Sequence, residues 1–235
     1  FDRGLYELPD GSEVGSGARG DLAAVVAAIL FDASARSASA AAGERFGKLR
    51  EPVVRLVNWM RAFNVRNIAP EYAGLLFDAL APSALSQHPY RSRSVFNFYR
   101  PGYVPPSTLS GSEGMTLPEF QLVNATTMPA YLNYISAFIF RETEDPDPDD
   151  PPDPQLNPAF YGAAFVAPYV EEKRLSSEPA RLVEHLDELL TFGSLSDEAK
   201  GAIAETVSSL PDDEDLRAQL AVFLVMSDPE YLIQR

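Results

Sequence analysis

The spacing of apolar residues is the feature that most constrains the fold of this chain. Apolar side chains recur three and four residues apart in several stretches, the period of one face of an α-helix. The pattern predicts an all-α fold of about seven to nine helices, bundle-like, with little or no β-structure. The predicted helices span residues 22–35, 52–63, 70–80, 118–141, 179–192, 196–210 and 213–226.

Several predicted helices carry recognisable start signals. Asp21 precedes the first helix, Pro52 stands where a proline begins the second, and Ser196 precedes the helix 196–210. Pro129 lies inside the stretch 118–141, so we expect a break or kink there. A last turn is expected at residues 227–232.

The second helix has an apolar stripe and a basic face. The arginines between the apolar residues predict that the opposite face is basic. The stripe consists of Val53, Leu56, Val57, Met60 and Phe63, and the basic face of Arg50, Arg55 and Arg61.

The segment 81–117 interrupts the helical pattern with prolines and glycines. It includes Pro89–Pro106, which reads PYRSRSVFNFYRPGYVPP. Flexible linkers lack large apolar side chains, whereas the aromatic residues here need a surface to pack on. The segment is therefore predicted to be an ordered loop between helices.

Pro89–Pro106 is also the best candidate binding site in the sequence. Arginine forks can hold a carboxylate, sulfate or phosphate at two points, tyrosine rings can stack, and an asparagine can set a tight turn. The alternative is architectural: the arginines bond to loop carbonyls, while Phe96, Phe98 and Tyr99 fill a core and clamp the helices. The candidate binding residues are Arg91, Arg93, Asn97, Tyr99, Arg100 and Tyr103.

Acidic residues are concentrated at the C-terminal end. Residues 1–141 carry 13 Arg/Lys and 12 Asp/Glu, whereas residues 142–235 carry 6 and 22. Such a field repels nucleic acid and anionic lipid, and it favours cations or basic partners. We therefore expect no nucleic-acid partner; acidic helix faces that merely keep the chain in solution are the simpler interpretation.

Residues 142–158 form an acidic, proline-rich excursion with seven acids and six prolines. It divides the chain into a helical core unit, residues 1–141, and an acidic helical unit, residues 159–235, that packs on the first. Oxygen ligands from the excursion suggest a weak calcium site, but alternating prolines favour an open, solvated loop, so no cofactor is expected. The calcium candidates are Asp145, Asp147, Asp149 and Asp150.

Other chemistry is weakly marked. The chain has no cysteine and only two histidines, His88 and His185, and neither lies in a recognisable catalytic motif. His185 and Glu188 could share a metal, but a second such pair is missing. No glycine-rich stretch has the spacing of a phosphate-binding loop, and no apolar run approaches the roughly 20 residues of a membrane span. No catalytic residue is assigned.

Four stretches together resemble a known bacterial family: RGDLAAVVAAILFDASAR, FGKLREPVVRLVNWMRAF, PYRSRSVFNFYRPGYVPP and PEFQLVNATTMPAYLNY. The chain is similar, along nearly its whole length, to the family catalogued as domain of unknown function 1800. The resemblance implies a protein about twice as long, whose N-terminal half is missing here. It also implies export to the periplasm or cell exterior, and a protein partner, either that N-terminal half or the neighbouring exported family of unknown function 1501.

Two functions are compatible with these observations. The first is an exported, non-enzymatic scaffold or partner-binding module that presents the arginine-rich loop and the acidic unit. The alternative is the C-terminal half of an exported hydrolase-like enzyme whose catalytic groups lie upstream. The sequence leaves open whether the chain is an enzyme.

Overall fold

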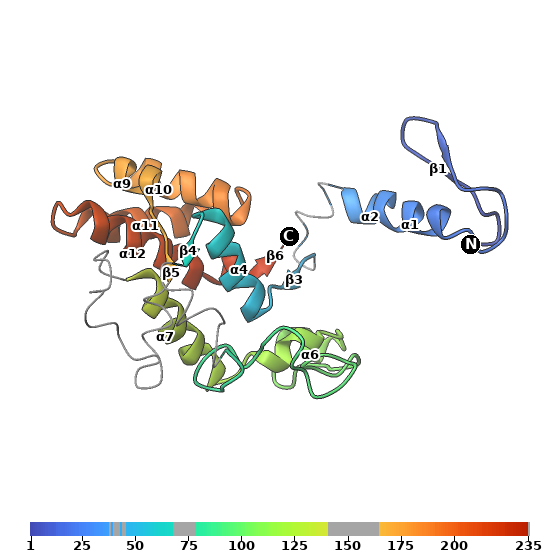
Figure 1. Cartoon of the computed structure of the whole chain (residues 1–235), viewed down its shortest axis with the longest axis horizontal. Helices are drawn as coiled ribbons and strands as arrows, with labels where there is room; N and C mark the ends of the chain where they lie inside the picture. Colours follow the sequence, from blue (N-terminus) through green and yellow to red (C-terminus); the bar gives the residue numbers. More distant parts are fainter. Residues whose placement is uncertain (38, 40–42, 44–45, 68–78, 141–164, 235) are drawn as a thin grey trace. The chain divides into compact units, whose positions relative to one another are not determined.

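The computed structural model in Figure 1 describes residues 1–37, 39, 43, 46–67, 79–140 and 165–234. The described part of the chain is predominantly α-helical, with short strands, as the apolar spacing predicts. It forms two compact units, one from Phe1 to Gly47 and one from Lys48 to Gln234. The predicted helix 70–80, apart from its last two residues, and the excursion 142–158 lie outside the described residues, as does the predicted domain boundary.

The first unit combines a hairpin with two helices. Strands β1 (Tyr6–Glu7) and β2 (Glu13–Val14) pair in antiparallel fashion. Helix α1 (Leu22–Phe31) follows, and the Asp21 carboxylate accepts hydrogen bonds from the backbone N–H groups at its first turn, so the predicted cap is confirmed. A non-helical residue, Asp32, separates α1 from α2 (Ala33–Arg36) within the single helix predicted there.

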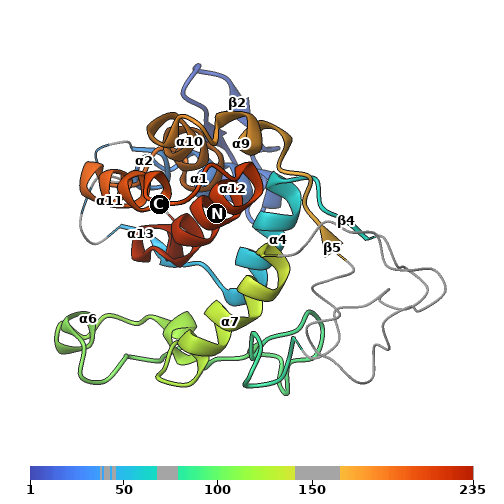
Figure 2. The same ribbon diagram turned by 90° about the vertical axis from the view of Figure 1, so that its left-hand side faces the viewer.

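The second unit contains the hydrophobic core. The core is built around α12 (Glu214–Ser227), whose Ala218, Val222 and Met226 are completely buried. Figure 2 shows α12 surrounded by helices of the second unit, and α10 (Pro179–Leu186) and α11 (Asp197–Ser208) contact it. Helix α4 (Pro52–Ala62) joins the core through Trp59, whose Nε1 donates to Tyr169 Oη at 2.7 Å.

Two short strand pairs connect distant parts of the second unit. β3 (Lys48–Leu49) pairs with the C-terminal β6 (Ile233–Gln234), and β4 (Arg66–Asn67) pairs with β5 (Phe165–Val166). Both pairs are antiparallel. Each strand has two residues, too few to show an alternating pattern in the sequence.

Helix α4 (Pro52–Ala62) begins at Pro52 as predicted. The prediction that its arginines form a solvent-exposed basic face was wrong. Arg61 is exposed, whereas Arg55 is only 1% exposed and Arg50, just before the helix, only 5%. Both guanidinium groups lie over aromatic rings that come from other parts of the chain. The helix is therefore covered on a side that the sequence assigned to solvent.

The stretch 118–141 also differs from expectation. It forms a 3₁₀-helix, η1 (Pro118–Leu122), and then α7 (Thr127–Ile139). The break lies at Asn124, whose Oδ1 accepts from the backbone N–H groups of residues 126 and 127. Pro129 is in the first turn of α7, where a missing N–H costs no helical hydrogen bond, so the kink predicted at Pro129 was wrong.

The C-terminal helices follow the predicted order. Ser196 caps α11, Phe192 ends the predicted helix 179–192, and the last turn is helical. The elements are α9 (Val170–Leu175), α10 (Pro179–Leu186), η2 (Asp187–Thr191), α11 (Asp197–Ser208) and α13 (Pro229–Leu232). The last turn of the predicted helix 179–192 is a π-helix, η2. The sequence did not predict the short helix α9, which precedes α10.

Candidate binding surface on residues 79–117

The arginine–aromatic segment, residues 89–106, lies within a loop that is fixed at its base by Glu51. Gln87, which is buried, donates to one Glu51 carboxylate oxygen through Nε2 and accepts from Val53 N through Oε1 at 3.1 Å. Tyr99 Oη donates to the other carboxylate oxygen at 3.0 Å. Both sides of the loop therefore meet at the start of α4.

Further bonds hold the middle of the segment. Asn97 Nδ2 donates to Tyr99 Oη at 3.3 Å, and the backbone N–H of Arg100 donates to the Gln121 side chain in η1. Burial raises the pKa of the Tyr99 phenol, so this group stays protonated and can keep donating to Glu51. After the segment, the chain forms the short helix α6 (Leu109–Ser112), which Thr108 caps.

The backbone of the loop 79–117 adopts left-handed conformations at several residues other than glycine. Asn97 has φ of +67°, and Ser86, Tyr90 and Ser107 have φ of +53°, +61° and +59°. Asparagine tolerates this conformation, but tyrosine and serine adopt it at some cost in free energy. Residues in such conformations persist where surrounding contacts fix the backbone, and they occur often at functional sites.

The side chains proposed as binding residues divide into two groups. Tyr99 and Tyr103 are half-buried, whereas Arg91, Arg93 and Arg100 are exposed. Asn97 is exposed and faces Tyr99. The three guanidinium groups make no hydrogen bond or ion pair with the described residues, so the expected bonds to loop carbonyls are not found there.

The aromatic residues do not fill a core as the architectural alternative required. Phe96 is 60% exposed, the neighbouring Val95 is 95% exposed, and Tyr90 is fully exposed. Phe98 and Tyr99 are half-buried and do not belong to the hydrophobic core. The segment is thus fixed at its base and exposes its arginines and several apolar side chains.

A second unusual group of charges, the buried arginine pair Arg50 and Arg55, was not found from the sequence. The Arg50 guanidinium lies 4.5 Å from the ring centre of Tyr231, and that of Arg55 lies 4.7 Å from the ring centre of Tyr131. Arg55 Nε donates to Arg50 O at 2.7 Å, and Arg50 Nη1 donates to Leu190 O at 3.2 Å. Cation–π contacts and carbonyls thus replace the usual carboxylate partner.

The surroundings of the buried arginine pair shift several pKa values. Desolvation lowers the pKa of Arg55, an effect that Tyr131 and Tyr231 oppose. Desolvation also raises the pKa of Tyr131 well above its ordinary value, and that of Tyr231 to about 12. Tyr131 Oη donates to Met226 O at 3.1 Å and Tyr231 Oη to Arg55 O at 3.2 Å, so both phenols act as protonated donors.

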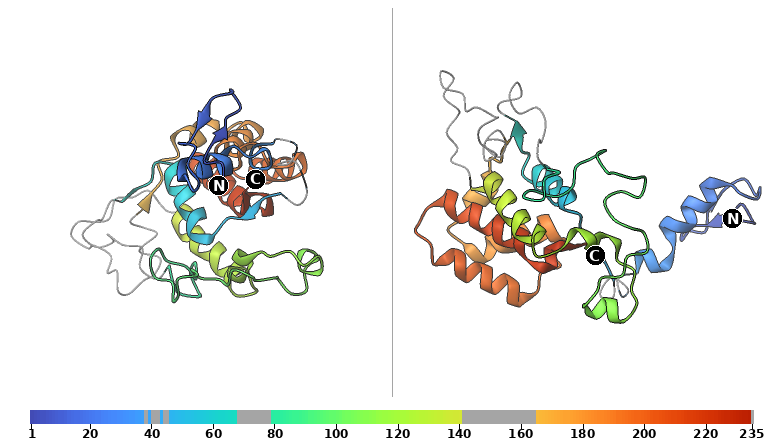
Figure 3. Two further views of the ribbon diagram at one scale, coloured as in Figure 1. Left: turned by 90° about the vertical axis from the view of Figure 1, so that its right-hand side faces the viewer. Right: turned by 90° about the horizontal axis from the view of Figure 1, so that it is seen from below.

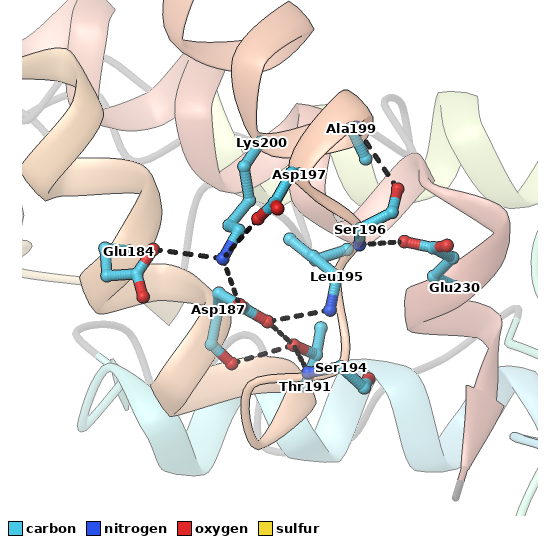
Figure 4. Close-up of polar contacts among 10 residues, drawn as sticks. All are labelled: Glu184, Asp187, Thr191, Ser194, Leu195, Ser196, Asp197, Ala199, Lys200 and Glu230. Atoms are coloured by element: carbon cyan, nitrogen blue, oxygen red, sulfur yellow. Dashed lines mark hydrogen bonds and ion pairs between the residues drawn. The ribbon is translucent and has the colours of Figure 1, made fainter. Parts of the chain in front are cut away.

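The corner between η2 and α11 contains a third polar group, drawn in Figure 4. Asp187 is 1% exposed, and its Oδ1 accepts from Leu195 N at 3.0 Å and from the Thr191 hydroxyl. Lys200 Nζ lies 3.2 Å from a Glu184 oxygen and 3.6 Å from Asp187 Oδ2. The hydrogen bond with Glu184 raises the pKa of Lys200, so the amine stays protonated and cannot serve as a nucleophile near neutral pH.

Among the described residues, neither histidine is hydrogen-bonded to a nucleophile. His185 Nε2 lies 2.9 Å from Glu172 Oε1, and His88 Nδ1 lies 2.8 Å from the carbonyl of the next residue. Among the described residues, no group of three or more His, Cys, Asp or Glu could hold a metal ion. The calcium candidates of residues 145–150 lie outside that part of the chain.

The family to which the chain belongs follows from a comparison of sequences. The profile of the family described as "Protein of unknown function (DUF1800)" matches residues 14–233. The chain belongs to this family. No curated protein and no solved structure matches the chain.

The DUF1800 match covers both the arginine–aromatic segment and the buried arginine pair. The resemblance read from the four sequence stretches is therefore confirmed. Within the described ranges of this DUF1800 chain, no helix is long and apolar enough to cross a membrane, in agreement with the sequence.

Proposed function

We propose that the chain is a non-enzymatic scaffold or partner-binding module, exported from the cell, whose contact surface is the arginine–aromatic segment. The observation that carries the proposal is the exposure of arginine and apolar side chains on a loop whose base is fixed. Exposed apolar side chains grouped on one surface mark interaction sites more often than scattered ones do. Arginine and aromatic residues are also the types enriched in the contacts that dominate binding.

The bonds at the base of the loop favour binding over mere connection. Glu51, just before α4, accepts a hydrogen bond from Tyr99, and Gln121 in η1 accepts one from Arg100 N. Gln87, just before the segment, donates to the same Glu51 carboxylate. A surface that is ordered before it meets its partner loses less conformational entropy on binding. The left-handed residues described above fit the same purpose, since they fix the direction of the chain at each turn.

Export and the identity of the partner rest on family resemblance. The partner would be the neighbouring exported family of unknown function 1501 or the N-terminal half of the chain's own full-length protein. The acidic C-terminal unit offers a second contact surface for basic groups. The hydrolase-like alternative remains a prediction, since no observation on the described residues favours it.

Site-specific photo-crosslinking in the native bacterium tests this function. A photoreactive phenylalanine analogue is placed at Phe96, and a matched control carries it at Phe192, which is also exposed, at 80%, but lies at the end of η2. We expect adducts from position 96 and few from position 192. The proposal fails if position 96 gives no adduct, or gives the same adducts at the same yield as position 192.

A further inference from the structure

The tip of the arginine–aromatic segment is a tight turn with apolar side chains. Ser94 and Asn97 form an isolated bridge, and Val95 and Phe96 lie between them. Ser94 Oγ accepts from Phe96 N at 3.2 Å, and the left-handed Asn97 closes the turn. The tips of tight turns are ordinarily Gly, Asn, Asp, Ser or Pro, because these residues suit the backbone and water. Here the turn holds two large apolar side chains in solvent.

The charges within the segment itself have one sign, whereas Glu51 and Glu119 act on Tyr99 at its base. Arg91, Arg93 and Arg100 are exposed, and no Asp or Glu occurs from Ala79 to Ser112. Tyr90 next to them is fully exposed. A protruding apolar tip, a tyrosine and several arginines are the combination that suits a boundary between acyl chains and anionic headgroups.

We infer that the partner of this surface is an anionic lipid surface, into whose interface Val95 and Phe96 insert while the three arginines contact the headgroups. The inference rests on the proposed function, because it concerns the same contact surface, and it takes an anionic lipid surface there in place of the protein partner that family resemblance suggests. A lipid surface fits better than an acidic peptide, because an extended peptide binds in a groove, whereas the apolar side chains here protrude from a turn. No step of this binding requires a membrane-spanning helix.

Among the described residues, acidic side chains are concentrated away from the tip that would contact the lipid. Residues 165–234 carry 15 Asp/Glu and 5 Lys/Arg, and they include α9 to α12. Figures 1 and 2, and the left view of Figure 3, place these helices and the segment 79–117 on different sides of α7 within the second unit. Exposed charges are screened within about 8 Å at physiological ionic strength. We therefore expect the repulsion of anionic lipid to act mainly at the acidic helices.

Vesicle co-sedimentation of the full chain tests the inference. The probes are vesicles of phosphatidylcholine mixed with phosphatidylglycerol, which supplies anionic headgroups, and vesicles of phosphatidylcholine alone. We expect binding to the anionic vesicles that weakens in high salt. Val95→Ser/Phe96→Ser should reduce partitioning at least about tenfold, and each Arg→Gln change at Arg91, Arg93 or Arg100 about fivefold.

Matched controls separate the tip from the rest of the surface. Phe192→Ser removes another exposed aromatic residue, and Arg174→Gln/Arg181→Gln removes two exposed arginines from α9 and α10. These variants should bind as the unchanged chain does. Circular dichroism confirms that every variant is folded; all the changed side chains are exposed, so we expect unaltered spectra.

Three results would overturn the inference: no binding to anionic vesicles, equal binding to both vesicle types, or a tip variant that binds like its controls. If vesicle binding is absent while photo-crosslinking at position 96 still captures one protein, the partner is a protein. The lipid inference then fails and the proposed function stands. If both experiments give nothing, both are wrong.

Discussion

Arg55 is the residue whose environment departs most from ordinary expectation. It is almost fully buried, it lies near a second buried arginine, and no described carboxylate is within ion-pair distance of either. A buried charge is costly unless it is compensated, and the compensation here consists of aromatic rings and backbone carbonyls. One of its nitrogens, Nη2, is buried without any hydrogen-bond partner. The contribution of Arg55 to stability therefore comes from packing and from its bond to Arg50 O.

Substitutions at Arg55 test this assignment. Arg55→Ala removes the long side chain from the core and is expected to lower the free energy of unfolding by about 3 kcal/mol. Arg55→Met keeps much of the volume without the charge and should cost less than half as much, because it also relieves the desolvation of the guanidinium. Urea unfolding followed by the single Trp59 measures both. Equal losses in the two variants would show that the charge itself stabilises the core.

Buried tyrosines predict how stability depends on alkaline pH. Burial raises the pKa of Tyr131, Tyr169 and Tyr231 above the ordinary value near 10. In the unfolded chain these phenols lose their protons near pH 10, whereas in the folded chain they keep them, so the unfolded state binds fewer protons above that pH. Stability is therefore fully present below pH 10 and decreases as pH rises through 10 to 12, where Tyr231 also titrates.

Spectrophotometric titration of tyrosine checks this dependence. We expect a step of tyrosine ionisation above pH 10 that coincides with loss of structure by circular dichroism. Tyr131→Phe should make the decrease of stability above pH 10 less steep. A single titration step with the fold intact would contradict the assignment.

At this scale the sequence predicted the caps but not the buried charges. The caps Asp21 and Ser196 depend on neighbouring residues alone, so their pattern is visible in the sequence. The rings that cover Arg50 and Arg55 belong to Tyr231 and Tyr131, far along the chain. The spacing of residues within one helix predicts that an arginine between apolar residues faces solvent. It cannot show that an aromatic ring from a distant part of the chain will cover that arginine.

Among the elements, the loop 79–117 depends most on a single side chain. Glu51 accepts hydrogen bonds from Gln87 and Tyr99, which stand on either side of the exposed part of the segment. Glu51→Ala should therefore loosen the loop while leaving the core, which does not include Glu51, in place. We expect trypsin to cut after Arg91 and Arg93 about tenfold faster, because local opening becomes less costly.

Limited proteolysis with mass spectrometry measures this change. Glu205→Ala, an exposed substitution on α11, is the matched control and should leave the cleavage rate unchanged. Unaltered cleavage in Glu51→Ala would mean that the other contacts suffice to hold the segment. In that case the bond between Arg100 N and Gln121 is the one to remove next.

Elements were predictable where their signals are local. Pro52 and the apolar spacing were enough to place α4, and the long C-terminal helices followed from the same pattern. The kink was misplaced because a proline is tolerated in the first turn of a helix, and the sequence did not show that α7 begins only at Thr127. The two-residue strands carry no period, so their pairing is a consequence of the tertiary fold.

For the whole molecule, the decisive feature is the placement of the core. Every residue of the hydrophobic core lies between Leu49 and Leu232, within the second compact unit. The pairing of β3 with β6 joins the start of this unit to its end. The sequence predicted an all-α chain, but the pairing of residues 48–49 with residues 233–234 could not be read from spacing because it depends on contacts across the whole unit.

A fragment of residues 48–235 should consequently fold by itself. It contains the entire core and both ends of the β3–β6 pair, and a compact unit with its own core is able to fold alone. Trp59, the chain's single tryptophan, is 1% exposed, so its fluorescence reports on that core. We expect blue-shifted emission and one cooperative unfolding transition. A fragment of residues 60–235 lacks β3 and Trp59 together with most of α4, and it should show no cooperative transition by circular dichroism. Red-shifted emission from the longer fragment, or equal cooperativity in both, would contradict a core that is complete between residues 48 and 234.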